Sequence, residues 1–241
     1  MEGFIDIHSH ILPGLDDGAK NLEETREMLQ IACQEGIRTI IATPHFFSPE
    51  KSASLEKVVE TVFHIREKIK EWKLSIDIYP GNEVYYQSET TELLEDGRIC
   101  SMVGSRYLLV EFHPMVEYTY LRDGLWKLLS CGRYPILAHA ERYDCLFGKR
   151  ERLEELKKQG VYFQVNASSF LGGIFQERTK RAGYLLKKEI VDFVSTDAHS
   201  AGHRSPKIRD CYNYICKKAG GERAKQLFFQ NAEVILLDKR L

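Results

Sequence analysis

Histidine and carboxylate residues stand at regular points along this 241-residue chain, each directly after a short apolar run. The first of these runs ends in Asp6-Ile-His-Ser-His10. Because alternate residues of a β-strand point to the same side, we expect Asp6, His8 and His10 to share one face. Neutral imidazoles beside carboxylates are typical ligands of divalent manganese, iron or zinc. The first apolar run therefore predicts part of a metal site, and Asp16 and Asp17 follow it in the next loop.

The same pattern recurs after five later apolar runs. The polar side chains that follow them are His45, Glu83, Glu111, His139 and the pair Asp197 and His199. One such residue alone is usually structural or solvated, but six strand ends of this kind favour a single shared site. In a barrel of parallel strands these ends meet at one rim, where enzymes of that architecture build their sites.

The elements that must position these residues alternate between short apolar strands and longer amphipathic helices. Strands are expected at residues 4–8, 37–43, 75–80, 107–112, 134–138, 161–165 and 190–196. Helices are expected at residues 22–34, 55–72, 91–95, 121–130, 150–159, 180–188, 208–218 and 222–229, the first with Asn21 as N-cap and Gly36 beyond its end. Seven alternations predict an α/β fold with parallel strands and right-handed crossovers. We expect one domain over residues 1–241, closed as a barrel, although an open doubly wound sheet has a similar pattern.

Composition narrows the class of protein. The formal net charge of −1 gives no electrostatic case for nucleic acid binding. No apolar stretch is long enough for a membrane span, and the first residues lack the basic and apolar segments of a signal peptide. We therefore expect a cytoplasmic protein without direct membrane insertion. Its six cysteines contain no Cys-x2-Cys pair, so we expect free thiols and no zinc ribbon.

Several blocks of residues occur in a fixed order over nearly the whole chain. They are Asp6-Ile-His-Ser-His10, Leu15-Asp-Asp-Gly18, Ala42-Thr-Pro-His45, Gly81-Asn-Glu83, Val110-Glu-Phe112, Ala138-His-Ala-Glu-Arg142, Phe163-Gln-Val-Asn166 and Ser195-Thr-Asp-Ala-His199. In this order they resemble the PHP (polymerase and histidinol phosphatase) superfamily, and within it the bacterial manganese-dependent tyrosine phosphatases of capsule and exopolysaccharide synthesis. The resemblance implies a distorted TIM-like (β/α)7 barrel.

The same resemblance implies a site with three divalent ions, Mn²⁺ first, with iron, zinc or magnesium as alternatives. The ligands that it implies are His8, His10, Asp17, His45, Glu83, Glu111, His139, Asp197 and His199. Glu83 would bridge two ions, and Arg142 with Arg204 would hold the phosphate. Ala140 stands where many relatives have proline, which leaves the pose of Arg142 open.

The implied reaction is hydrolysis of phosphotyrosine by a metal-bound hydroxide, with phenolate as a good leaving group. The implied target is the tyrosine-rich tail of a membrane-associated kinase that controls polysaccharide synthesis. Two other functions remain open on the residues alone. One is a small-molecule phosphatase, for example of histidinol phosphate, and the other is a metal-stabilised scaffold without activity.

A second phosphatase motif competes with this interpretation. Cys100 and Arg106 match the Cys-x5-Arg loop of thiol-based tyrosine phosphatases, but here the loop precedes a strand instead of following one. No role is assigned to His64, His113 or His203. The aromatic residues expected in loops after strands, any of which could stack on a phenyl ring or simply pack, are Tyr118, Tyr120, Phe170 and Phe175.

Overall fold

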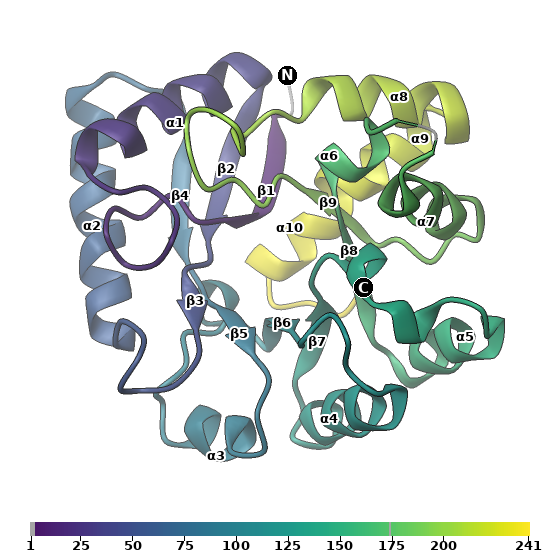
Figure 1. Cartoon of the computed structure of the whole chain (residues 1–241). Helices are drawn as coiled ribbons and strands as arrows, with labels where there is room; N and C mark the ends of the chain where they lie inside the picture. Colours follow the sequence, from purple (N-terminus) through teal and green to yellow (C-terminus); the bar gives the residue numbers. More distant parts are fainter. Residues whose placement is uncertain (1–2, 174) are drawn as a thin grey trace.

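The structure is a computed structural model that describes residues 3–173 and 175–241, with short strands inside and helices around them (Figure 1). The strands are β1 (Phe4–Ser9), β2 (Ile37–Ala42), β3 (His45–Phe46), β4 (Asp77–Pro80), β5 (Glu83–Tyr85), β6 (Tyr107–Glu111), β7 (Tyr134–Leu137), β8 (Tyr162–Asn166) and β9 (Phe193–Ser195). The α-helices are α1 (Leu22–Glu35), α2 (Leu55–Glu71), α3 (Thr90–Glu95), α4 (Tyr118–Ser130), α5 (Arg150–Gln159), α6 (Ala167–Phe170), α7 (Glu177–Lys187), α8 (Arg209–Ala219), α9 (Gly221–Lys225) and α10 (Asn231–Leu236).

The nine strands occupy seven positions of a barrel, because two positions are split. The hydrogen-bonded orders are β1-β2-β4 and β3-β5-β6-β7-β8-β9, and the pairs within them are parallel. Only Thr43-Pro44 separates β2 from β3, and only Gly81-Asn82 separates β4 from β5. Pro44 has no N–H for the ladder, so the strand breaks there. The predicted parallel α/β fold is confirmed, with its barrel distorted at these two breaks.

The barrel closes between its first and last strands. The backbone N–H of Asp197 donates to the carbonyl of His8 at 2.9 Å, and that of His10 donates to the carbonyl of Ala198 at 2.8 Å. A parallel bridge joins Ser9 to Ala198 at the same point. This contact excludes the open doubly wound sheet.

The side chains inside the barrel change from apolar to polar toward the carboxyl ends of the strands. In β6, Tyr107 and Leu109 belong to a buried cluster inside the barrel, and Glu111 comes two residues later on the same face. Strands β1, β2, β7, β8 and β9 and helix α10 contribute to this cluster, which also contains Ile5, Ile7, Ile41, Ile136, Ala138, Tyr162, Phe193, Ala232 and Ile235. Residues that alternate with them, such as Leu108 and Val110, belong to the larger core that includes residues of the surrounding helices. Polar side chains therefore occupy the carboxyl ends of the strands.

Local signals explain where most elements begin and end. The Asn21 side chain accepts a hydrogen bond from the Glu24 N–H and caps α1, and Gly36 ends it with a φ of 93°. Other boundaries differ from the prediction: α4 begins at Tyr118 instead of residue 121. The expected helix at 222–229 is instead α9, a π-helical turn (Gln226–Gln230) and α10. The short elements β3, β5 and α6 were not predicted, because two to four residues carry no periodic pattern.

Among the described residues, no helix is both long and apolar enough to cross a membrane. The six cysteines are free thiols, as the sequence predicts.

Candidate metal centre

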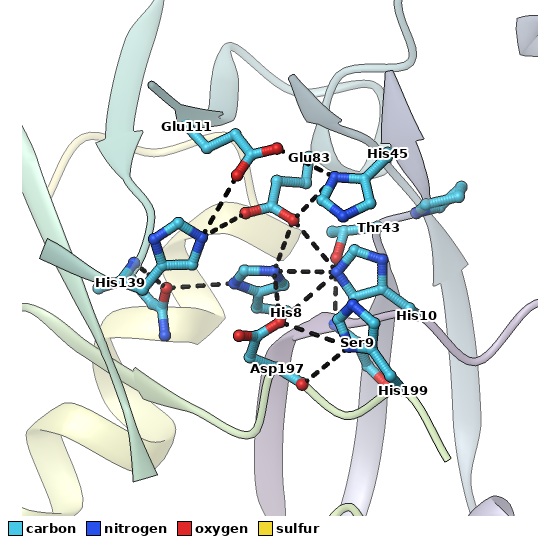
Figure 2. Close-up of polar contacts among 12 residues, drawn as sticks. His8, Ser9, His10, Thr43, His45, Glu83, Glu111, His139, Asp197 and His199 are labelled. Carbon is cyan, nitrogen blue, oxygen red and sulfur yellow. Dashed lines mark hydrogen bonds and ion pairs between the residues drawn. The ribbon is translucent and has the colours of Figure 1, made fainter. Parts of the chain in front are cut away.

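The side chains proposed as ligands meet at the carboxyl end of the barrel. Figure 2 shows His8 and His10 from β1 and its end, Glu83 from β5 and Asp197 after β9 pointing toward one another. His45 begins β3, Glu111 ends β6, and His139 follows β7, so the loops and strand ends of the whole ring contribute.

The central group contains His8, His10, Glu83 and Asp197, all buried. The Nε2 atoms of His8 and His10 each lie 3.1 Å from Oε2 of Glu83. The same two nitrogens lie 3.3 and 3.6 Å from Oδ1 of Asp197. Four ligand atoms therefore converge on one point.

Two further groups share members with the central one. Atoms of His10, Asp17, His45 and His199 converge in one, and those of His45, Glu83 and Glu111 in the other. His139 adjoins them, with its Nε2 atom 2.8 Å from Oε1 of Glu83 and 3.6 Å from Oε2 of Glu111. The shared residues join the three groups into one continuous cluster of candidate ligands.

The tautomers of the central histidines show why a cation fits. The side-chain oxygen of Gln164 lies 3.2 Å from Nδ1 of His8 and accepts from the backbone N–H of His139 at 2.7 Å. It is therefore an acceptor, and His8 carries its proton on Nδ1. A carboxylate oxygen of Asp16 lies 2.6 Å from Nδ1 of His10 and fixes the same tautomer there.

Both Nε2 atoms of neutral His8 and His10 then present lone pairs to each other across 3.2 Å. The carboxylates of Glu83 and Asp197 add acceptors at the same point. Only protons or a cation can satisfy four converging acceptors, and nitrogen with carboxylate oxygen is a donor set for divalent transition metals.

The pKa shifts agree with a site that draws in positive charge. Burial disfavours a charged His10, but its hydrogen bonds with Asp16 and Glu83 outweigh burial and raise its pKa to about 10. His199 shows the opposite: burial and the charge of His10, whose ring centroid is 3.8 Å away, lower its pKa to about 4. Burial would raise the pKa of Glu83, but the facing imidazoles hold it well below its usual value.

Two of the centre's residues hold a left-handed backbone. His139 has a φ of 34° and Asp197 a φ of 54°. Such a conformation costs roughly 1–3 kcal/mol for a residue other than glycine. It turns each side chain inward just after its strand ends, and the hydrogen bond from the His139 N–H to Gln164 helps to hold that turn.

Asp6 does not join the centre, contrary to the expectation that it shares a face with His8 and His10. Its carboxylate accepts from the backbone N–H of Thr196 at 3.0 Å and from the Thr196 hydroxyl. The pairing of β1 shifts register between Asp6 and Ser9, so strict alternation fails there.

Sequence reasoning also gave no role to Asp16 and Gln164. Besides orienting His10, the Asp16 carboxylate accepts from the backbone N–H groups of His45 and Gly18. The adjacent pair Asp16 and Asp17 in the loop after the first strand was the available signal, but nothing in it tells which carboxylate faces inward.

Arg142 and Arg204 lie together at the edge of the centre. Their Nη2 atoms lie 2.6 and 2.8 Å from Oδ2 of Asp197, whose other oxygen faces the histidines. Both line a cavity of about 410 Å³, which Arg178, His203 and Lys207 also line. Ala140 in place of proline therefore leaves Arg142 directed at the centre.

The thiol-phosphatase alternative has no support in the geometry. Cys100 is buried, and burial raises the pKa of its thiol to about 12, so it is no thiolate at neutral pH. Arg106 forms an ion pair with Asp238 near the amino end of β6, the opposite end from the histidines. The two residues do not form a phosphate loop.

The other histidines and loop aromatics singled out from the sequence lie outside the groups of converging ligands. His64 and His113 are exposed, outside the groups of converging ligands. Tyr118 donates to Glu155 at 2.6 Å and Phe170 packs on Tyr214, so both serve packing. Tyr120 and Phe175 are exposed.

Comparison with known proteins agrees with the geometry. The family model described as "Capsular polysaccharide synthesis, CpsB/CapC" matches residues 4–237. The chain is 37% identical to the tyrosine-protein phosphatase CpsB of Streptococcus pneumoniae, over 98% of this chain and 99% of that protein. It is 31% identical to the putative tyrosine-protein phosphatase CapC of Staphylococcus aureus, over 98% and 92%.

One solved structure superposes with a TM-score of 0.91 and 28% identity, covering 98% of this chain and 95% of that chain. It comes from work on YwqE of Bacillus subtilis and CpsB of Streptococcus pneumoniae, described as unique metal-dependent tyrosine phosphatases.

Proposed function

Because the chain belongs to the capsular polysaccharide synthesis CpsB/CapC family, we propose that it is a metal-dependent protein-tyrosine phosphatase. The observation that carries this proposal is that imidazole nitrogens and carboxylate oxygens converge at the centre, with two arginines at its edge. The combination suits a phosphate monoester, which brings its own negative charge to a cationic site.

We assign the centre three divalent ions, Mn²⁺ first. Their ligands would be His8, His10, Asp17, His45, Glu83, Glu111, His139, Asp197 and His199, and Glu83 belongs to two of the groups of converging atoms. When bound, such ions lower the pKa of a coordinated water to near 7 and offset charge on phosphate oxygens. Asp16 and Gln164 hold the tautomers of His10 and His8 that leave both Nε2 atoms free to bind.

Arg142 and Arg204 orient the phosphate. Each guanidinium has five N–H donors, so each arginine can maintain its ion pair with Asp197 and still donate to a phosphate oxygen. Their fixed charge stabilises the transition state of an in-line displacement. The hydroxyl of tyrosine has a pKa of about 10, so phenolate is a stable leaving group. The reaction therefore does not depend on a strong general acid.

Membership of a capsular polysaccharide synthesis family supports a proposal for the biological setting. We place the enzyme in the cytoplasm, with residues 1–241 as one phosphoesterase domain. Its target in this proposal is the tyrosine-rich tail of a membrane-associated kinase that regulates capsule or exopolysaccharide synthesis.

The test is hydrolysis of a phosphotyrosine peptide by chelator-stripped protein before and after Mn²⁺ is added, with histidinol phosphate measured in parallel. We expect activity only with the ion, and a far higher kcat/KM on the peptide. Faster turnover of histidinol phosphate would point instead to a small-molecule phosphatase on the same fold. A metal-loaded protein that hydrolyses neither substrate would favour a scaffold.

A further inference from the structure

Two aromatic rings stand next to the metal centre without a role so far. Phe47 stacks on His45 with ring centroids 5.2 Å apart and planes 28° apart. Tyr85 lies beside Phe47 at 5.6 Å between centroids. Phe47 is 38% exposed, so one side of its ring packs on the centre and part of it faces solvent.

The strand pattern explains how these rings reach that place. In the parallel pair of β3 and β5, His45 lies opposite Glu83. Phe47 comes two residues after His45, and Tyr85 comes two residues after Glu83. At this spacing each ring lies on the same side as the candidate ligand before it. In both segments a candidate ligand is thus followed two residues later by an aromatic ring, Phe47 just after β3 and Tyr85 at the end of β5. Tyr85 is also the register partner of Glu111.

The backbone of Phe47 is held from two sides. Its N–H donates to the hydroxyl of Ser52 at 2.7 Å, and its carbonyl accepts from the side-chain amide of Gln87 at 2.9 Å. A large apolar side chain that is exposed and yet fixed in position is suited to binding an apolar group.

We propose that Phe47, supported by Tyr85, is the contact surface for the phenyl ring of phosphotyrosine. The inference rests on the proposed phosphatase function and deepens it. The phenyl ring is joined to phosphorus through a single oxygen, so a phosphate bound among the ligands leaves the ring just outside them. Arg142 and Arg204 come from loops after β7 and β9, whereas Phe47 directly follows β3 and Tyr85 ends β5. The anion and the ring of the substrate are thus recognised by different parts of the rim.

This division of the rim accounts for selection of tyrosine. Phosphoserine and phosphothreonine carry the same phosphate but no ring to stack on Phe47. Aromatic pairing adds free energy beyond the area that it buries, and its loss corresponds to about a tenfold change in affinity.

The experiment compares wild type with Phe47→Ala in Mn²⁺-loaded protein. We measure kcat and KM on a phosphotyrosine peptide, the inhibition constant of inorganic phosphate, and bound metal. We expect KM to rise about tenfold, while the phosphate inhibition constant and the metal content stay unchanged. Phe47→Trp restores the KM. Phe63→Ala is the matched control, because Phe63 is 59% exposed but lies on α2 away from the centre.

An unchanged KM in Phe47→Ala overturns the inference. So does a parallel loss of phosphate affinity or metal, because Phe47 would then act through His45. If the wild type itself fails on the peptide while it hydrolyses histidinol phosphate, the proposed function fails first and the inference falls with it.

Discussion

The two ends of the barrel interior are built from the same strands, but one end is apolar and the other is polar. At the amino end, aromatic and aliphatic side chains pack together, and the polar atoms among them have partners. The Tyr107 hydroxyl donates to the carbonyl of Lys239 at 2.8 Å and accepts from the N–H of Leu241 at 3.1 Å. At the carboxyl end, histidines and carboxylates are buried facing one another, and their acceptor atoms need a cation.

The difference shows where this protein is stabilised and where it is prepared for chemistry. Burial of apolar area at the amino end stabilises the fold without any ligand. The carboxyl end opposes folding, because buried charges and left-handed residues such as His139 are costly. The strands between them hold the unfavourable end in place.

The largest effect is expected from His8→Ala. It removes a nitrogen at the point where four ligand atoms converge, so bound metal and turnover should fall together to background. Metal content by mass spectrometry and the rate on a phosphotyrosine peptide check this. Full turnover with a full complement of metal in this variant would contradict the assignment of His8.

Arg142→Ala separates binding of metal from binding of substrate. It leaves the ligands in place but removes a charge-assisted donor to the phosphate. We expect unchanged metal content and a loss of kcat of about 10²- to 10³-fold, the usual result of deleting one such donor. The phosphate inhibition constant should rise as well. Loss of metal in parallel would mean that Arg142 acts mainly by holding Asp197.

Asp16→Asn tests the layer behind the ligands. An amide has no negative charge and only one acceptor oxygen for the three N–H groups that now donate to Asp16, so it supports the Nδ1–H tautomer of His10 less well. We expect metal affinity to fall about 10- to 100-fold, measured by competition with a chelator. Asp123→Asn, at an exposed position on α4, is the control that should bind metal normally.

The pH dependence of metal binding reports on the same end of the barrel. With its pKa raised to about 10, His10 is protonated at neutral pH in the metal-free protein, and a cation must displace that proton. Affinity should therefore strengthen as pH rises from 6 to 8, about tenfold per unit for each proton displaced. Titrations in two buffers of different ionisation enthalpy measure proton release. A flat profile would contradict the charge assigned to His10 in the metal-free protein.

Leu109→Ala changes the other end and should leave catalysis almost untouched. Leu109 is fully buried inside the barrel, two residues before Glu111 in β6. We expect about 2–5 kcal/mol less stability in urea unfolding and an unchanged kcat for folded, metal-loaded protein. A collapse of kcat with stability retained would show that the two ends are not independent.

The sequence was informative where one residue type has one use. Asn21 and Gly36 predicted the ends of α1, and apolar runs placed every main strand. Polar residues at strand ends predicted which side chains meet. The failures came where geometry depends on neighbours: the register shift in β1 turned Asp6 away, and only folding shows that Asp16 and not Asp17 supports His10. Phe47 was overlooked because β3 has only two residues.

The seam of the barrel has a consequence for how the protein is made. The contacts that close it join residues from distant parts of the chain, such as Asp6 and Thr196, 190 positions apart. The ribosome therefore releases β1 together with its early partner β2, but the contacts of β1 with the segment after β9 can form only when residues near 197 have emerged. Contacts of such long range are slow to form. The metal centre is thus among the last parts of a nascent chain that can assemble, so a truncated product ending before β9 has neither a closed barrel nor a complete site.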